Sequence, residues 1–342
     1  MYKTQRYNTQ TLVPVAGART TVRLQNKVQT RFIQLWNQAL VTIGTAFTSL
    51  LNGGSSWAIY DFLGILENGK ERVLLDGPTL RFISNLLSAQ QIPEQLLAGV
   101  GVQTNTPVSG VLRIPFSFPL AANPGETVFV ERDQNQVVEV FANLRADGGI
   151  GGLGFGGGGA GSIPSASLQV LQGSDKLSSH KPLFIPTIRQ ISTPIPQAGT
   201  YPIYLRASWP LRAIVIKQTS DQGEISDLVV SAVIRSDYRD IIGPNPVPWQ
   251  QLIQGQQQDF AGFMARGAPV VAYGNSAYYG HVFQEGGRLS NVLDAPREPN
   301  LRVEVTTQAP AEAGVTNPRI VITLLELERE DGVTADQIPF TI

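Results

Sequence analysis

Three carboxylates surround a short polar turn in the first third of the chain: Asp61, Glu67 and Glu71. Paired carboxylates are the groups with which glycosidases protonate a leaving oxygen and attack the sugar or activate water. These three flank Asn68-Gly69, however, and Asn-Gly is the strongest short signal for a hairpin turn. Charges beside an exposed turn are usually solvated, so we interpret them as surface residues and expect no catalytic group here.

The chain has few residues that could bind a transition metal or act as a catalytic nucleophile. The chain has no cysteine and two histidines, His180 and His281, far apart in the sequence. A transition-metal site would therefore need carboxylates for most of its ligands, and no G-x-S-x-G nucleophile elbow is present. We expect no metal and no enzyme activity, and we interpret His281, beside Tyr279 and Phe283, as a packed or hydrogen-bonded residue.

The segment Gly152-Leu-Gly-Phe-Gly-Gly157 formally matches the dinucleotide fingerprint G-x-G-x-x-G. That fingerprint needs a preceding strand, a following helix and an acidic residue about twenty positions later. Here more glycine and then Ile163-Pro164 follow, so no helix can begin, and no phosphate-binding G-K-[ST] occurs anywhere. We therefore expect no nucleotide cofactor, and no cofactor of any kind.

The same segment belongs to the most biased stretch of the chain. Ten of the fourteen residues from Gly148 to Gly161 are glycine, and such a run cannot hold a helix or a central strand. Blocks of comparable length lie on both sides, rich in short apolar runs. We interpret the stretch as the separator of two similar units.

Composition limits the class of protein. The 342 residues suffice for about two domains, and only 15% are charged, with a net charge of −1, against about a quarter in typical soluble domains. No basic tract suggests nucleic-acid binding, and we find no signal peptide or bilayer-spanning apolar run. We therefore expect a soluble chain that covers much of its surface with partner subunits.

The local patterns are mostly those of strands. Alternating apolar and β-branched residues predict strands through both blocks, among them a hairpin around Asn68-Gly69. Asp76, Gly77 and Pro78 precede apolar residues at helical spacing and predict one short helix. The Gln-rich segment from Trp249 to Phe263 is weakly helical at best.

The two blocks repeat one order of events: a tryptophan-led apolar run, a turn with glycine, a strand, an excursion and a closing pair of strands. The matched segments are Trp57 to Leu66 with Trp209 to Ile216, Asn68-Gly69 with Gln222-Gly223, Val73 to Leu75 with Leu228 to Ile234, and Thr127 to Leu144 with Leu301 to Leu327. About eight strand signals per block favour jelly rolls over seven-stranded immunoglobulin-like sandwiches. The predicted fold class is all-β, with two tandem eight-stranded jelly-roll sandwiches and a few short helices.

The predicted organisation has five parts. They are an N-terminal arm at 1–20, jelly roll 1 at 21–146, a glycine-rich linker or loop at 147–180, jelly roll 2 at 181–330 and a C-terminal tail at 331–342. Strand signals resume only near Leu168, so the spacer is longer than two adjoining sandwiches need.

The segment from Ile59 to Leu80 combines a strand, the Asn-Gly turn, a second strand and the Asp-Gly-capped helix. With the size of the chain and its two strand-rich blocks, this order resembles the double jelly-roll major capsid proteins of tailless icosahedral viruses. That lineage includes membrane-containing bacteriophages and adenovirus hexon. The resemblance implies a structural virion protein made in the host cytoplasm, in which homotrimers form pseudo-hexagonal tiles of an icosahedral capsid.

The resemblance also implies partners and contact sites. The partners are the other two subunits, neighbouring capsomers and other virion proteins, with no specific nucleic acid. Lys3 and Arg6 in the arm are candidates for contact with an internal lipid membrane or the inner surface, at about 1 kcal/mol each. Ile150, Leu153 and Phe155 are candidate anchors of an intersubunit loop.

A different class of function stays open on the sequence alone. A two-domain β-sandwich could be a carbohydrate-binding or glycan-cleaving receptor-binding spike, and a baseplate or fibre component of a tailed phage is a third possibility. Trp57, Trp209 and Trp249 would be the sugar platforms of such a protein, but we interpret them as core anchors. A monomer that binds an oligosaccharide would favour the spike, and a trimer that forms shells or sheets would favour the capsid.

Overall fold

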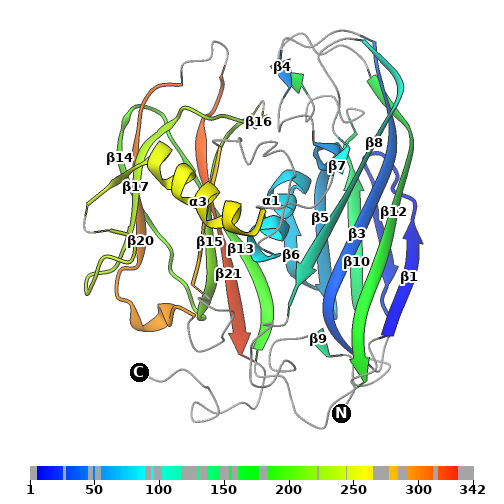
Figure 1. The fold of residues 1–342 in the computed structure, drawn as a ribbon, viewed down its shortest axis with the longest axis horizontal. Helices are drawn as coiled ribbons and strands as arrows, with labels where there is room; N and C mark the ends of the chain where they lie inside the picture. Colours follow the sequence, from blue (N-terminus) through cyan, green and yellow to red (C-terminus); the bar gives the residue numbers. More distant parts are fainter. Residues whose placement is uncertain are drawn as a thin grey trace. The chain divides into compact units, whose positions relative to one another are not determined.

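A computed structural model of the chain forms two compact units (Figure 1): the first contains the described residues up to Thr187 and also Arg329, and the second runs from Ile188 to Glu328. The structure describes residues 6–25, 28–44, 49–50, 55–88, 94–95, 102–116, 129–130, 137–146, 154–155, 161–176, 184–221, 223–243, 245–264, 277–283, 292–310 and 315–329. Within these residues no helix is long and apolar enough to cross a membrane.

The first unit contains two antiparallel sheets. Sheet 1 has the order β1-β12-β3-β8-β7, with β9 also paired to β3, and sheet 2 has the order β2-β10-β5-β6. The strands of sheet 1 are β1 (Arg6–Leu12), β3 (Val28–Ile43), β7 (Glu94–Gln95), β8 (Gln103–Pro115), β9 (Phe129–Val130) and β12 (Gly161–Lys176). Those of sheet 2 are β2 (Arg19–Arg23), β5 (Tyr60–Glu67), β6 (Lys70–Leu75) and β10 (Val138–Leu144). A two-stranded ribbon pairs β4 (Ser49–Leu50) with β11 (Gly154–Phe155).

The second unit repeats this plan. Sheet 3 has the order β13-β21-β15-β16, with β19 also paired to β15, and sheet 4 has the order β14-β20-β17-β18. The strands of sheet 3 are β13 (Phe184–Pro194), β15 (Leu211–Ser220), β16 (Gly223–Glu224), β19 (Tyr278–Val282) and β21 (Arg319–Arg329). Those of sheet 4 are β14 (Gly199–Tyr204), β17 (Val229–Arg235), β18 (Val247–Pro248) and β20 (Arg302–Thr307). Two 3-10 turns, η2 (Ser56–Ile59) and η6 (Ala295–Arg297), lie in the first and second unit.

Both units use the same strand order. The main strands in chain order are β1, β2, β3, β5, β6, β8, β10 and β12 in the first unit, and β13, β14, β15, β17, β18, β19, β20 and β21 in the second. In each, one sheet joins the first, eighth, third and sixth strands, and the other joins the second, seventh, fourth and fifth. A helix lies between the fifth and sixth strands in both, α1 (Gly77–Ser88) and α3 (Trp249–Met264). This is the eight-stranded jelly roll, twice over, and the predicted fold class is confirmed.

The repeat predicted from the sequence is nevertheless shifted by one strand. The run that follows Trp57 becomes β5, the fourth strand of its unit, whereas the run that follows Trp209 becomes β15, the third. In strand order the counterpart of β15 is β3, because both are the third strand of their unit. Apolar runs look alike in sequence, and only the pairing partners distinguish a third strand from a fourth.

Two strands fall in segments that the sequence places in an arm and a linker. The predicted arm at 1–20 contains β1, and the predicted linker at 147–180 contains the sixteen-residue β12. β12 lies between β1 and β3 in sheet 1. It gave little strand signal because small or polar residues, such as Ser165, Ser167 and Gln169, occupy alternate positions on one face.

The predicted hairpin and first helix are both present. β5 and β6 pair around Asn68 and Gly69, whose φ angles are 50° and 79°, as a tight primed turn requires. At α1, the Asp76 carboxylate accepts hydrogen bonds from the backbone N–H of Thr79 (2.9 Å) and from its hydroxyl (2.8 Å), which satisfies otherwise unpaired helix donors.

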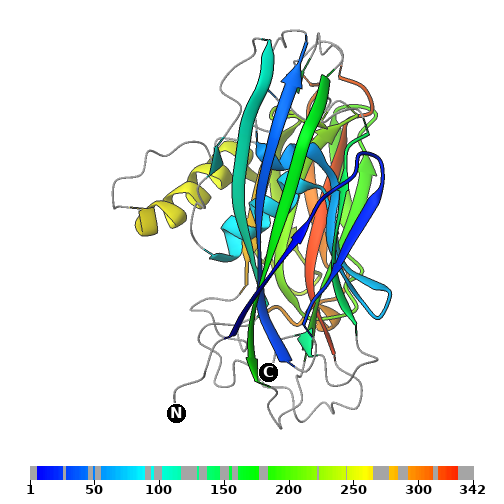
Figure 2. The ribbon, with the colours of Figure 1, turned by 90° about the vertical axis from the view of Figure 1, so that its right-hand side faces the viewer.

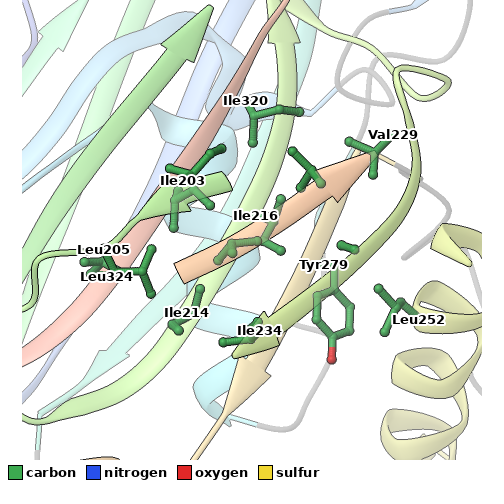
Figure 3. Close-up of a cluster of buried hydrophobic side chains, with 14 of the residues drawn as sticks. Ile203, Leu205, Ile214, Ile216, Val229, Ile234, Leu252, Tyr279, Ile320 and Leu324 are labelled. Carbon is green, nitrogen blue, oxygen red and sulfur yellow. The ribbon is translucent and has the colours of Figure 1, made fainter. Parts of the chain in front are cut away.

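The second helix, α3, forms in the segment that the sequence predicts to be weakly helical at best, and it packs on the core of the second unit. Among residues 249–256, the part of α3 whose side chains the structure describes, Trp249, Leu252, Ile253 and Gln256 are buried, at helical spacing. Polar glutamines between them mask this pattern in the sequence. Figure 3 shows Leu252 of α3 facing the cluster that β15, β17 and β21 form, and the Trp249 ring meets Tyr279 edge-on at 6.1 Å.

Candidate functional site

The three carboxylates that could have formed a hydrolytic pair are each held by a separate arginine. Asp61 lies 3.4 Å from Arg145, Glu67 lies 2.7 Å from Arg72, and Glu71 lies 3.2 Å from Arg19. They therefore serve as ion-pair partners at different points of sheet 2. Across the described ranges, no cluster of three or more His, Asp or Glu side chains could hold a metal ion.

The aromatic candidates are mostly internal. Trp57 and Trp249 are fully buried core residues, as predicted, and Trp209 is half-buried. His281 packs edge-on against Phe283, with the ring centroids 4.8 Å apart, which agrees with its interpretation as a packed residue. His180 and the segment 156–160 lie outside the described residues.

The outer face of sheet 1 is the surface that sequence reasoning missed. Figure 2 shows β8, β3 and β12 of this sheet side by side. Strand registers and alternating burial give its outward residues: Tyr7, Thr9 and Thr11 on β1, Ser167, Gln169, Leu171 and Gly173 on β12, Phe32, Gln34, Trp36, Gln38 and Leu40 on β3, and Pro107, Ser109, Val111, Arg113 and Pro115 on β8. Arg113 is the one charged residue among these seventeen.

The opposite sheet of the same unit is different. The outward positions of sheet 2 include Arg19, Arg23, Glu71 and Glu139, the mixture of charges that keeps a solvated sheet apart from other proteins. Trp36 lies in the middle of the outer face of sheet 1 and remains 42% exposed. A nearly uncharged face around an exposed tryptophan has the composition of a protein contact surface.

Three residues from neighbouring strands stack on this face. The Phe32 ring of β3 covers Gly173 of β12, the neighbouring strand on one side. Arg113 comes from β8, the neighbouring strand on the other side, and its guanidinium carbon lies 3.6 Å from the centroid of the Phe32 ring. Burial lowers the pKa of Arg113, and the nearby Tyr7 partly offsets that shift. The one charged side chain among the outward residues of this face, Arg113, is exposed and stacks on an aromatic ring in a cation–π contact.

A second polar cluster lies beneath the face and orders its edge. The buried Glu94 carboxylate of β7 accepts hydrogen bonds from the Ser55 hydroxyl (2.7 Å) and from the Ser56 N–H (2.5 Å) and hydroxyl (2.8 Å). Its other oxygen lies 2.5 Å from Arg81 of α1. One carboxylate therefore ties β7, the turn η2 and the helix α1 together.

Of the five site residues predicted from the sequence, the structure describes the backbone of two. Lys3, Ile150 and Leu153 lie outside the described residues. Arg6 begins β1, opposite Ser174, and Phe155 lies in β11, opposite Ser49. The outer face of sheet 1 could have been found from the run Phe32, Gln34, Trp36, Gln38, Leu40, since every second residue from 32 to 40 is uncharged.

No protein-family model matches the chain, and no curated protein sequence does. Solved structures do match. The structure of the STIV MCP, from Sulfolobus turreted icosahedral virus, has 16% identity and a TM-score of 0.66 over 94% of this chain and 96% of that one. The major capsid protein of bacteriophage PM2 has 10% identity and a TM-score of 0.56 over 95% and 100%. The PBCV-1 virus capsid has 11% identity and a TM-score of 0.60 over 96% and 94%.

These likenesses extend over nearly the whole of both chains in each pair, so they include both jelly rolls. At such low identity they establish the fold, and the fold is the one predicted by resemblance to the double jelly-roll coat proteins.

Proposed function

We propose that this double jelly-roll chain is the major capsid protein of an icosahedral virus. Three copies form a pseudo-hexagonal capsomer, and the capsomers tile the shell. The chain acts by assembly and carries out no reaction of its own. It is made in the host cytoplasm and functions in the virion, beside neighbouring capsomers and other virion proteins.

The observation that carries this proposal is the identical strand order of the two units. A ring of three identical chains has three-fold symmetry. When each chain contributes two sandwiches of the same architecture, the ring presents six similar blocks, which can pack as a near-hexagonal tile. The matching coat proteins share this doubled architecture from end to end.

The outer face of sheet 1 supports a role in subunit contacts. A charge-poor face that stayed in water would expose Trp36 and favour uncontrolled association. In the capsomer another subunit covers it, and burial of its apolar area stabilises the trimer. The low charge of the whole chain, 15%, agrees with extensive covered surface.

Two further contacts belong to the same proposal. Lys3 and Arg6 meet an anionic lipid surface or the shell interior. Binding of the chain and of a Lys3→Gln/Arg6→Gln variant to vesicles with and without anionic lipid would test the lipid contact. Ile150, Leu153 and Phe155 anchor a loop on a neighbouring subunit. Deletion of residues 148–160 leaves β12 intact and should weaken the trimer; an unchanged trimer would reduce this segment to a linker.

Light scattering and electron microscopy of the purified chain test the main proposal. We expect a particle of about 111 kDa, three times the 37.0 kDa chain, with pseudo-hexagonal outline, and sheets or shells at high concentration. A monomer that binds oligosaccharides would instead support a receptor-binding protein. A trimer that never forms a lattice would indicate a fibre or baseplate component.

A further inference from the structure

Strand β1 leaves one edge of sheet 1 open. It pairs with β12 in an unbroken register from Arg6↔Ser174 to Leu12↔Leu168. No strand in the described ranges pairs along its other side. Tyr7, Thr9 and Thr11 are exposed, with Tyr7 at 60%. A strand edge with no partner strand in the described part of the chain is a template for another strand.

Other long edge strands carry more charges or prolines than β1, whose one charged residue is Arg6 at its first position. β2 has Arg19 and Arg23, β6 has the sequence Lys-Glu-Arg at 70–72, and β13 and β14 contain prolines, at 186, 194 and 202. Charges and prolines of this kind block pairing with a second strand. From Tyr7 to Leu12, β1 has neither.

The edge strand β19 is closed by a different device. Its residues Tyr278 to Gly280 are buried, and the Gly280 N–H donates to the Gln256 side chain of α3 at 2.8 Å. An open edge is therefore a particular property of β1 among these strands.

The sequence of β1 is complementary to itself. In an antiparallel pair centred on Thr9, Thr9 faces its own counterpart, Tyr7 faces Thr11, Asn8 faces Gln10 and Arg6 faces Leu12. Thr–Thr and aromatic–β-branched pairs are favourable across strands, and no like charges oppose each other. The same arrangement of β2, centred on Thr21, would set Arg19 against Arg23.

We propose that β1 pairs with β1 of a second copy of this chain, antiparallel and about a two-fold axis through Thr9. Sheet 1 then continues from one copy into the next through the joined edges. The location of this contact rests on the proposed function: a two-fold contact cannot lie inside a three-fold ring, so it joins subunits of adjacent capsomers.

Cysteine cross-linking tests the register, because the chain has no cysteine of its own. Facing residues of antiparallel strands have Cα atoms about 4.5–5.5 Å apart, within the span of a disulfide. Under mild oxidation of the assembled protein, Thr9→Cys should form a disulfide-linked dimer of about 74 kDa, twice the 37.0 kDa chain.

Thr11→Cys is the matched control, an exposed threonine on the same face of the same strand. Its two copies would be displaced by four residues, about 13 Å along the strand, so they should not cross-link. A mixture of the Thr11→Cys and Tyr7→Cys proteins should cross-link to each other. No disulfide at position 9, or equal yields at 9 and 11, would overturn the proposed pairing.

The readouts also separate this inference from the proposed function. Trimers with no β1 cross-link would leave the capsomer intact and refute the β1 contact. A cross-linked dimer without trimers would support the β1 contact and refute the capsomer. Equal unfolding temperatures of the reduced Thr9→Cys, Thr11→Cys and unmodified chains would show that the variants fold alike. If Thr9→Cys alone unfolded at a lower temperature and formed no disulfide, Thr9 would not be the exposed edge residue that the proposal requires, and the proposal would be overturned.

Discussion

The Phe32 ring on β3 fills the space in which Gly173 on β12 would carry a side chain. A Cβ atom placed on Gly173 would lie 2.2 Å from two carbons of that ring. Sheet 2 repeats the relationship: Phe141 covers Gly64, a Cβ there would lie 2.5 Å from the ring, and Arg19 stacks 3.8 Å from the ring centroid. Each sheet of the first unit thus carries a phenylalanine over a cross-strand glycine, with an arginine above it.

Replacement of Gly173 by alanine should therefore destabilise the first unit. The ring must move off its position, and its contact with Arg113 must change, at a cost of about 1–3 kcal/mol in the free energy of unfolding. Denaturant titration measures this cost. Gly199→Ala is the control, because its nearest atom lies 3.7 Å away, and it should have little effect. Equal effects of the two substitutions would contradict the assigned contact.

Glu94→Gln should be costly because the buried carboxylate accepts three hydrogen bonds through one oxygen and forms an ion pair with Arg81 through the other. The substitution leaves Arg81 without its counter-charge and presents an amide to the hydroxyls of Ser55 and Ser56. We expect a loss of about 3 kcal/mol in unfolding free energy, typical of a broken buried pair. Glu71→Gln breaks the exposed pair with Arg19 and should cost about 0.5 kcal/mol. A small loss for Glu94→Gln would show that the cluster contributes little.

Tyr60 should make the fold sensitive to alkali. Burial raises the pKa of its phenol above the ordinary value of 10.0, so the neutral form is favoured in the folded chain. Its stabilising contribution is complete below pH 10 and is lost as the pH rises above 10, by about 1.4 kcal/mol per unit.

Tyr60→Phe separates this effect from other ionisations. At pH 8 the variant should be less stable by about 1 kcal/mol, because Asn37 loses the hydrogen bond that the phenol donates (2.8 Å). Between pH 10 and pH 11 the difference should shrink or reverse. Denaturant titrations of both proteins at the two pH values measure it, and a constant difference would refute the buried phenol.

Trp36→Glu should abolish trimers while the chain stays folded. Trp36 is 42% exposed, so the substitution costs the isolated subunit little, but it places a charge in the middle of the face that the proposed trimer would cover. Sedimentation and circular dichroism measure the two effects. Phe62→Glu is the control, an aromatic residue of similar exposure (46%) on sheet 2. If both variants lost the trimer to the same degree, the outer face of sheet 1 would have no special role.

The sequence by itself determined much of the local structure. Asn68-Gly69 defined a hairpin because its residues adopt positive φ at little cost, and Asp76 defined a helix start because its carboxylate caps free N–H groups. Alternation and turn spacing then gave two tandem jelly rolls. All of these features depend on interactions between residues a few positions apart, so they can be inferred from the local sequence.

Only the tertiary structure decided which strands lie side by side. β12 became a central strand although its alternate residues are small and polar, because β1 and β3 satisfy its backbone on both sides. The same pairing brought Phe32 to Gly173, collected seventeen residues from four strands into one nearly uncharged face, and left β1 with an open edge. Pairing between strands more than a hundred residues apart depends on the packing of the whole sheet, so no local sequence pattern predicts it.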